Sequence, residues 1–157
     1  MARIPKFLPA VTILATLTAR ADGGLGVAFG DAAGIASRKL EDERCLLVLS
    51  DFSDASGRPL AERLHDTGLT AREFFERLEF RNGRHESTCQ RSRVDAFVHI
   101  GQRTVFVCPG GCFDFGRRDV GHASNVLIHE MLHTLGLGEN PPTSLGITSR
   151  VAERCGR

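Results

Sequence analysis

Hydrophobic residues recur at helical spacing in several parts of the chain. Pro59 precedes an apolar segment over residues 60–66, where a proline suits the first position of a helix, and Gly68 follows its end. Thr70 and Glu73 then have the spacing of a capping box. The pattern predicts two successive helices, and the apolar side of the second is formed by Phe74, Phe75 and Leu78.

Two further helices are predicted near the C-terminus. One begins near His122 or the following residue and runs to about Leu135 through strongly apolar sequence. Pro141 and Pro142 block any helical continuation, and Thr143 or the next residue can cap a last helix. In that helix one face is shared by Ile147, Val151 and Cys155.

Short apolar runs predict strands. Residues 44–50 contain four consecutive apolar side chains, which suits a buried strand. Residues 94–100 and 104–108 are predicted as two strands joined by a short glycine-containing hairpin connection. Residues 22–39 are rich in glycine and alanine without firm periodicity, so we expect a loose lead-in or a short propeptide there.

The first residues have the pattern of a secretory signal peptide. Arg3 and Lys6 precede an uncharged apolar run over residues 7–18, and residues 19–21 form a small-x-small cleavage site. The run is short for a transmembrane span, although an uncleaved membrane anchor is the alternative. We therefore expect residues 22–157 to form a single secreted or periplasmic domain, a monomer without stable membrane insertion.

Charge and cysteine content narrow the range of functions. The chain has 20 basic and 19 acidic side chains, and this balance argues against a nucleic-acid partner. Five cysteines follow the predicted cleavage site, so an oxidising compartment allows two disulfides and one spare thiol, with the pairing left open by the sequence. The five are Cys45, Cys89, Cys108, Cys112 and Cys155.

Cys108 and Cys112 flank a tight Pro-Gly-Gly turn and invite the hypothesis of a second metal site with His122. No second pair of ligands at a suitable spacing completes a tetrahedral set in the sequence. Disulfides are therefore favoured for this segment.

The candidate chemistry lies on the predicted helix over residues 122–135. His129 and His133 are four residues apart, so their imidazoles share a face and can bind one metal ion. Glu130 is positioned to reach a water molecule beside that ion without binding the ion itself. Gly136 can take the left-handed conformation that ends a helix and reverses the chain, which lets Glu139 fold back as a third ligand.

A rival third ligand is Glu153, which lies twenty residues after His133, a separation similar to that in thermolysin-like gluzincins. Glu139 is favoured because Gly136 provides the local turn and because no aspartate follows Glu153 to support it.

The stretch from His129 to Glu139 resembles the H-E-x-x-H-x-x-G-x-x-(H/D) pattern of metzincin-type zinc metallopeptidases, and the segment over residues 127–155 is similar to small secreted bacterial proteins with this motif. The resemblance implies an α+β, zincin-like fold: a small mixed sheet packed by helices, with zinc in a cleft beneath a strand edge. The chain departs from the pattern in two ways. It has glutamate at position 139, and its only methionines, Met1 and Met131, leave no methionine turn.

The resulting hypothesis is a secreted, zinc-dependent endopeptidase. Zn²⁺ bound by His129, His133 and Glu139 would activate water, and Glu130 would act as the general base. The substrate would be a peptide or protein, which can add as an extended strand to the edge of one of the two strands before the metal helix, unless both strands are interior.

An oxyanion donor besides zinc is needed for this reaction. Many zincins use tyrosine, but this chain has none, so the candidates are His99, His122 and Arg150. The alternatives are a non-catalytic zinc-binding or structural protein on a zincin scaffold, or a catalytic cleft that residues 22–39 close until they are removed.

Overall fold

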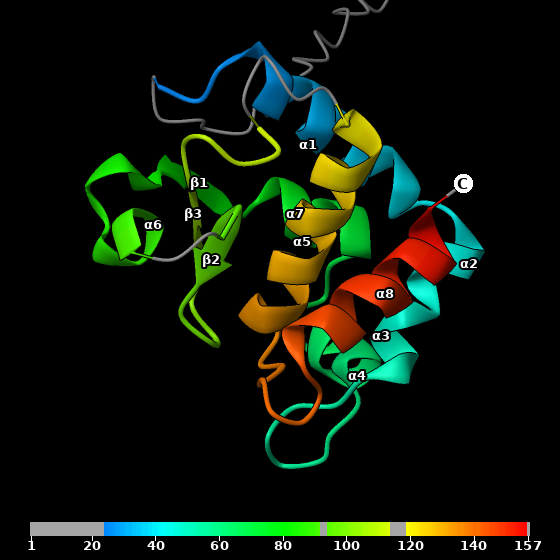
Figure 1. The fold of residues 1–157 in the computed structure, drawn as a ribbon. Helices are drawn as coiled ribbons and strands as arrows, with labels where there is room; N and C mark the ends of the chain where they lie inside the picture. Colours follow the sequence, from blue (N-terminus) through cyan, green and yellow to red (C-terminus); the bar gives the residue numbers. More distant parts are fainter. Residues whose placement is uncertain (1–23, 92–93, 114–118, 157) are drawn as a thin grey trace, which may run out of the picture.

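The structure, a computed structural model, describes residues 24–91, 94–113 and 119–156. Within this part the chain is α+β, with a small mixed sheet beside a group of helices (Figure 1). The predicted signal peptide, residues 1–21, lies outside the described residues. The elements in chain order are α1 (Val27–Lys39), α2 (Glu43–Leu46), α3 (Val48–Asp51), α4 (Leu60–His65), α5 (Ala71–Glu76), β1 (Glu79–Asn82), the 3₁₀ turn η1 (Gly83–His85), α6 (Ser87–Arg91), β2 (Ala96–Val98), β3 (Thr104–Val107), α7 (Val120–Thr134) and α8 (Ser144–Cys155).

The sheet has three strands in the described part, in the order β1-β3-β2. Strand β3 is central: it pairs in parallel with β1 and antiparallel with β2, with Phe97 opposite Phe106 across the β2–β3 pair. The predicted hairpin over residues 94–108 is therefore confirmed. Strand β1 was not predicted, because the turn signal at Asn82 and Gly83 obscured the alternation of buried Phe80 with exposed neighbours.

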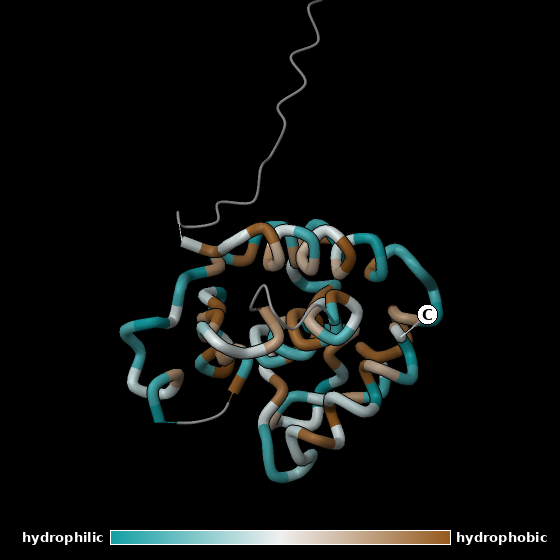
Figure 2. Tube along the Cα trace, turned by 45° about the horizontal axis from the view of Figure 1, so that its top comes forward, coloured by the Kyte–Doolittle hydropathy of each residue, from teal (hydrophilic) through white to brown (hydrophobic). Residues whose placement is uncertain are grey.

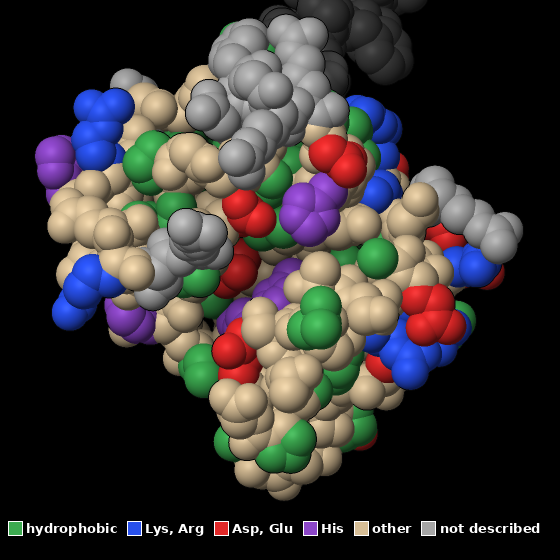
Figure 3. Space-filling model, in the orientation of Figure 1, with side chains coloured by type: hydrophobic (Ala, Val, Ile, Leu, Met, Phe, Trp, Pro, Cys, Tyr) green, Lys and Arg blue, Asp and Glu red, His purple; other side chains and the backbone are tan. Residues whose placement is uncertain are grey.

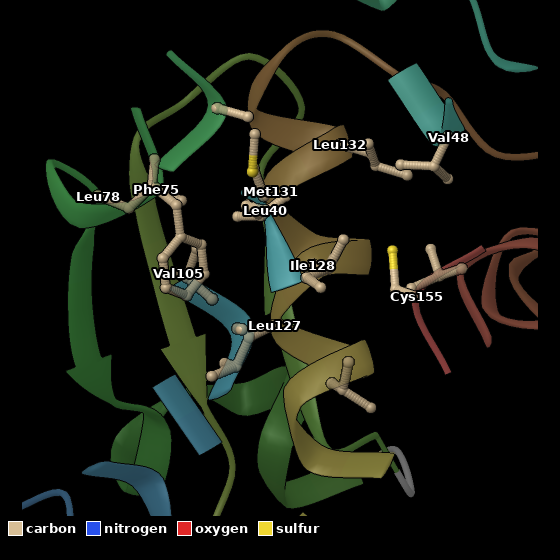
Figure 4. Close-up of a cluster of buried hydrophobic side chains, with 14 of the residues drawn as sticks. Leu40, Val48, Phe75, Leu78, Val105, Leu127, Ile128, Met131, Leu132 and Cys155 are labelled. Carbon is tan, nitrogen blue, oxygen red and sulfur yellow. The ribbon is translucent and has the colours of Figure 1, made fainter. Parts of the chain in front are cut away.

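Helix α7 forms the centre of the molecule and packs against α1, α8 and β2 (Figure 1). Figure 4 shows its apolar side chains projecting to opposite sides of the helix. Leu127 and Met131 point towards the side of Phe75 and the sheet, whereas Ile128 and Leu132 point towards α3 and α8. All four side chains are fully buried, and each contributes about 1.5–3 kcal/mol by leaving water. The helix that carries the histidines is thus fixed by the core.

The strand expected over residues 44–50 was wrong, because this segment forms the short helices α2 and α3. Cys45, Val48 and Leu49 are buried, at the i, i+3, i+4 spacing of a helix, while Leu47 is exposed. The side chain of Asp42 caps α2 by accepting a hydrogen bond from the Arg44 amide. A run of four apolar residues fits either element, and in this case the cap and the spacing of the buried positions agree on helix.

The loose lead-in expected over residues 22–39 was also wrong over residues 27–39, which form α1. Phe29, Ala32 and Ala36 are buried against the rest of the molecule, and hydrophilic and hydrophobic residues alternate along the helix (Figure 2). Two of these positions are alanine, so the apolar pattern is weak although the small side chains allow close packing on α7. Lys39 strengthens this contact by donating from Nζ to Asn125 Oδ1 at 2.8 Å.

The predicted helices after residues 59, 70 and 143 are confirmed as α4, α5 and α8. Thr70 and Glu73 form the expected capping box, and Thr143 caps α8 by accepting from the Gly146 amide. The shared apolar face of α8 is buried, and Arg154 binds Asp51 with two hydrogen bonds, which attaches α8 to α3.

Two disulfides form, Cys45–Cys155 and Cys89–Cys108, and Cys112 is free. The expectation of two disulfides and one spare thiol is confirmed. The first disulfide joins α2 to the end of α8, and the second joins α6 to the end of β3. Disulfides suggest an extracellular setting. Among the helices of the described residues, none is long and apolar enough to cross a membrane.

Candidate metal centre

Two histidines lie on the same face of α7, one turn apart. The Nε2 atoms of His129 and His133 face each other at 3.0 Å, and both side chains are buried. Their common direction follows from the spacing of four residues on a helix. The predicted helix over residues 122–135 is confirmed to within a few residues, and it presents two imidazole nitrogens to one point.

The turn predicted at Gly136 is also confirmed. Gly136 has a φ of 106°, which a glycine adopts without the steric cost that a side chain would incur. Its amide donates to the His133 carbonyl and the Leu137 amide donates to the Leu132 carbonyl, which is the hydrogen-bond pattern of a Schellman motif. Leu137 then forms a β-bridge with Asp54. The chain therefore reverses directly after the histidine helix and is held in place there.

Glu139 lies beyond this turn and returns to the histidines. Its Oε1 atom is 3.4 Å from His133 Nε2 and 3.8 Å from His129 Nε2. The Glu139 side chain is 41% exposed, against 6% and 7% for the two histidines, so the group opens to solvent on the glutamate side. The rival Glu153 lies on α8 and is paired with Arg150 at 3.0 Å. The structure thus brings Glu139, and not Glu153, to the two histidines.

The outer nitrogens of the two imidazoles have partners of their own. His133 Nδ1 lies 2.7 Å from the Leu137 carbonyl, which can only accept, so Nδ1 carries the proton and Nε2 presents its lone pair. His129 Nδ1 lies 2.9 Å from Thr148 Oγ1 on α8. A hydroxyl can accept from Nδ1–H, so the same tautomer is available to both rings. Partners of this kind orient histidines that bind metals.

The spacing of the donor atoms is compatible with a metal ion. The ligand atoms of His129, His133 and Glu139 all lie within 4.8 Å of one another. Tetrahedral coordination with bonds of about 2.0–2.2 Å separates neighbouring ligand atoms by about 3.3–3.6 Å. Of the observed separations, 3.4 Å lies within this range, and 3.0 and 3.8 Å lie just below and just above it. This His-His-Glu group could therefore hold a metal ion.

Glu130 is buried beside this group and does not belong to it. Burial raises the pKa of the Glu130 carboxyl to about 8, and the negative charge of Glu139 adds to the shift. Burial lowers the pKa of His129 to about 4, with a further contribution from His133. Neutral imidazoles are the form that binds metals, and a carboxyl that titrates near neutral pH can both accept and release a proton.

The three predicted oxyanion donors are engaged elsewhere in the described structure. Arg150 pairs with Asp51 and Glu153, and His122 lies near Asp95. His99 is exposed and its ring contacts two phenylalanines of the sheet. Sequence reasoning missed Thr148 and the Leu137 carbonyl, because neither a threonine on a later helix nor a backbone oxygen belongs to a recognisable motif.

Comparisons of the chain with protein-family models, with curated proteins and with solved structures find no match. The resemblance to metzincin-type peptidases therefore rests on His129, Glu130, His133 and the turn that follows them. The geometry of the group supports a possible metal site of His129, His133 and Glu139.

Proposed function

We propose that the protein is a zinc-dependent endopeptidase secreted from the cell. The observation that carries the proposal is the convergence of His129, His133 and Glu139, with the buried carboxyl of Glu130 next to them on the same helix. Two neutral imidazoles and one carboxylate are an established ligand set for catalytic zinc. A zinc ion held there would supply Lewis-acid activation of a water molecule, whose pKa it brings towards neutrality.

Glu130 is the proton carrier of the proposed reaction. Its carboxylate accepts the proton of the attacking water and then donates that proton to the amine that leaves when the peptide bond breaks. Burial raises its pKa to about 8 in the metal-free protein, and a zinc cation beside it would lower that value and favour the carboxylate that accepts the proton. Its burial also keeps bulk water away from the transferred proton.

An extended peptide is the proposed substrate. Strand β2 is an edge of the described sheet and packs against α7, so a peptide that adds to β2 would run beside the histidine helix. Figure 3 shows a hollow on this face, with histidine and acidic side chains gathered along it. The amide of Gly101, in the connection between β2 and β3, donates to the His133 carbonyl at 2.9 Å, which fixes the hairpin relative to the candidate metal site.

A secreted monomer is the form of the protein that we propose. The two disulfides fit an oxidising compartment, as does the signal peptide predicted for residues 1–21. The domain would begin after residue 21, and the balanced charge favours a peptide substrate over nucleic acid.

A second candidate function is zinc binding without turnover. It is favoured by the absence of tyrosine from the sequence, since the transition state needs an oxyanion donor besides zinc. The ion pairs of Arg150 with Asp51 and Glu153 also keep that guanidinium from serving as a free donor. In this case the cation would stabilise the end of α7 and the following turn.

Zinc content and cleavage of an unfolded protein such as casein, measured together, test the proposal. Glu130→Gln should keep zinc and lose at least about 100-fold in kcat, because general acid-base catalysis typically contributes 10²–10⁴-fold. Glu139→Ala should lower zinc affinity. Glu153→Ala is the matched control: this exposed carboxylate on α8 should be replaceable without effect on zinc or cleavage.

Three outcomes would contradict parts of this proposal. Full activity of Glu130→Gln would exclude the assigned general base. If Glu153→Ala lost zinc and Glu139→Ala retained it, the third ligand would be Glu153 and not Glu139. A wild-type protein that binds one zinc at the His129 site and cleaves no peptide would favour the non-catalytic alternative.

A further inference from the structure

A second group of metal-ligating side chains lies at the other end of α7. Ligand atoms of Asp95, Cys112 and His122 all lie within 4.8 Å of one another. They come from three separate segments: Asp95 just precedes β2, Cys112 follows β3, and His122 lies in the first turn of α7. Their convergence is a product of the tertiary fold, and no spacing motif in the sequence indicates it.

The sequence suggested Cys108, Cys112 and His122 as ligands but no fourth ligand at a suitable spacing. In the structure Cys108 forms a disulfide with Cys89, so it is not available to a metal, and Asp95 lies beside Cys112 and His122 instead. The result is a set of one thiol, one imidazole and one carboxylate. Cys112 is the one free thiol, since the other four cysteines of the chain are in disulfides.

The backbone around the group positions its carboxylate. The Cys112 amide donates to Asp95 Oδ1 at 2.8 Å, and the Cys108 amide donates to the Asp95 carbonyl at 2.9 Å. Gly111 packs so closely on Asp95 that a β-carbon at position 111 would collide with the carboxylate. One carboxylate oxygen is thereby anchored, and the other lies 3.7 Å from His122 Nε2. The backbone of His122 is fixed in turn, because its amide donates to the capping side chain of Asp119.

A nucleophilic Cys-His-Asp triad does not fit these contacts. In such a triad the imidazole separates the thiol from the carboxylate, so that the histidine can take the thiol proton. Here Asp95 contacts the Cys112 thiol directly as well as His122. Burial raises the pKa of Cys112 to about 12, with a further contribution from the charge of Asp95, which is the opposite of an activated thiolate.

We propose that Asp95, Cys112 and His122 bind a second zinc ion, which ties the segment after β3 to the start of both β2 and α7. Sulfur, nitrogen and oxygen donors together suit zinc, whereas calcium and magnesium take oxygen ligands. The separation of 3.7 Å between His122 Nε2 and Asp95 Oδ2 is close to the tetrahedral value of about 3.3–3.6 Å. Binding converts the Cys112 thiol to a thiolate and releases its proton to solvent.

The second site is separate from the His129 group but lies along the same face of α7. His122 and His129 are seven residues apart, which is about two helical turns or about 10 Å. The His122 side chain is 45% exposed, so solvent can complete the coordination. Three protein ligands from three segments would stabilise the path of the chain into α7, and with it the orientation of the histidine helix.

Zinc stoichiometry, measured after dialysis by elemental analysis, tests this inference with zinc itself as the probe. Wild type should bind two zinc ions per chain, and Cys112→Ser, Asp95→Asn or His133→Ala should each bind one. His85→Ala, which alters a histidine of η1 outside both groups, is the control and should bind two. Circular dichroism should establish that each variant is folded before its zinc content is compared.

Two further measurements report on the Cys112 thiol directly, and the first uses only the unaltered protein. Zinc should protect the Cys112 thiol from a disulfide-exchange reagent, and a chelator should restore its reactivity. Cobalt substitution should give a sulfur-to-metal charge-transfer absorption that persists in His133→Ala and disappears in Cys112→Ser. The second site would be overturned if wild type bound one zinc per chain and His133→Ala bound none, or if the Cys112 thiol reacted equally with and without zinc. Either result would leave the proposed peptidase unaffected.

Discussion

Thr148 lies on α8 with its hydroxyl 2.9 Å from Nδ1 of His129 on α7. The two residues are nineteen positions apart in the chain, and the turn that carries Glu139 lies between them. Ile147 and Val151 are buried on either side of Thr148, so α8 is held against α7 by apolar packing. The hydroxyl is therefore fixed in a position to orient the imidazole.

Replacing Thr148 with valine should weaken metal binding. Valine has nearly the same shape but cannot accept a hydrogen bond from Nδ1–H, so the ring loses the partner that fixes its tautomer and orientation. Loss of such a partner typically costs 10–100-fold in metal affinity. Competition with a chromophoric chelator would measure the zinc dissociation constant of the two proteins.

Two neighbouring variants provide the controls. Thr148→Ser keeps the hydroxyl and should stay close to wild type, and Ser149→Ala alters an exposed position on the same helix and should have no effect. Equal zinc affinity of wild type and Thr148→Val would mean that the hydroxyl only packs against the ring.

Replacing Gly136 with alanine should destabilise the turn that ends α7. The φ of 106° is strained for any side chain, and the new β-carbon would lie 3.3 Å from the β-carbon of Asp54. We expect a loss of about 1–3 kcal/mol in the free energy of unfolding and weaker zinc binding through displacement of Glu139. Urea denaturation and zinc titration would measure the two effects.

Gly138→Ala is the matched control for this change. It lies one residue before Glu139, and an added β-carbon there has nothing within 4 Å. A loss of stability equal to that of Gly136→Ala would show that the left-handed conformation is not the reason for the glycine at position 136.

The sequence predicted correctly those elements in which the caps, turns and spacing of apolar residues match the positions that are buried in the structure. The capping box of Thr70 and Glu73 and the cap at Thr143 marked helix starts, and the hairpin over residues 94–108 had both alternation and a turn. The strand prediction for residues 44–50 failed because an uninterrupted apolar run has neither the two-residue spacing of a strand nor the 3.6-residue spacing of a helix. Its helical character is visible only once Leu47 is known to be exposed while Val48 and Leu49 are buried.

The part of the candidate site that depends on residues close together in the sequence could be predicted. The spacing of His129 and His133 and the glycine at position 136 determine where the two rings and Glu139 lie, because helix periodicity and one left-handed residue are enough. Thr148 and Asp95 could not be predicted. Each comes from another element and reaches its partner only through the packing of α8 or of β2 on α7.

Removing the disulfide between Cys45 and Cys155 should lower stability more than any single surface change. It joins residues 110 positions apart, and a loop of about this length is worth about 4–5 kcal/mol of chain entropy in the unfolded state. The Cys45→Ser, Cys155→Ser double variant should therefore lose about 2–5 kcal/mol in the free energy of unfolding, measured by guanidinium titration.

The ion pairs between Arg154 and Asp51 also attach α8 to α3, and Arg154→Gln serves as the comparison. This pair is partly exposed, and its loss should cost no more than about 1 kcal/mol. Equal stability of the double serine variant and wild type would mean that the buried face of α8 is sufficient on its own to hold the C-terminus.

The stability of the chelator-treated protein should depend on pH through Glu130 and His129. The pKa of Glu130 is raised by burial to about 8, so the folded state holds a proton that the unfolded carboxyl releases above its ordinary pKa of 4.5. The resulting loss of stability grows as pH rises and is complete above about pH 8. The pKa of His129 is lowered from 6.5 to about 4, so its contribution to the stability of the folded state is present above about pH 6.5 and is lost as pH falls towards 4.

The two effects oppose each other between about pH 4.5 and 6.5, and Glu130 acts alone from 6.5 to 8. Wild type should therefore lose on the order of 2 kcal/mol in the free energy of unfolding over that upper window. Glu130→Gln cannot titrate and should show a flat profile there while keeping the decline towards acid. Glu153→Gln, an exposed and paired carboxylate, should follow wild type. A fall in stability from pH 6.5 to 8 that persists in Glu130→Gln would assign the titration to another group and remove the physical basis for its role as the proton carrier.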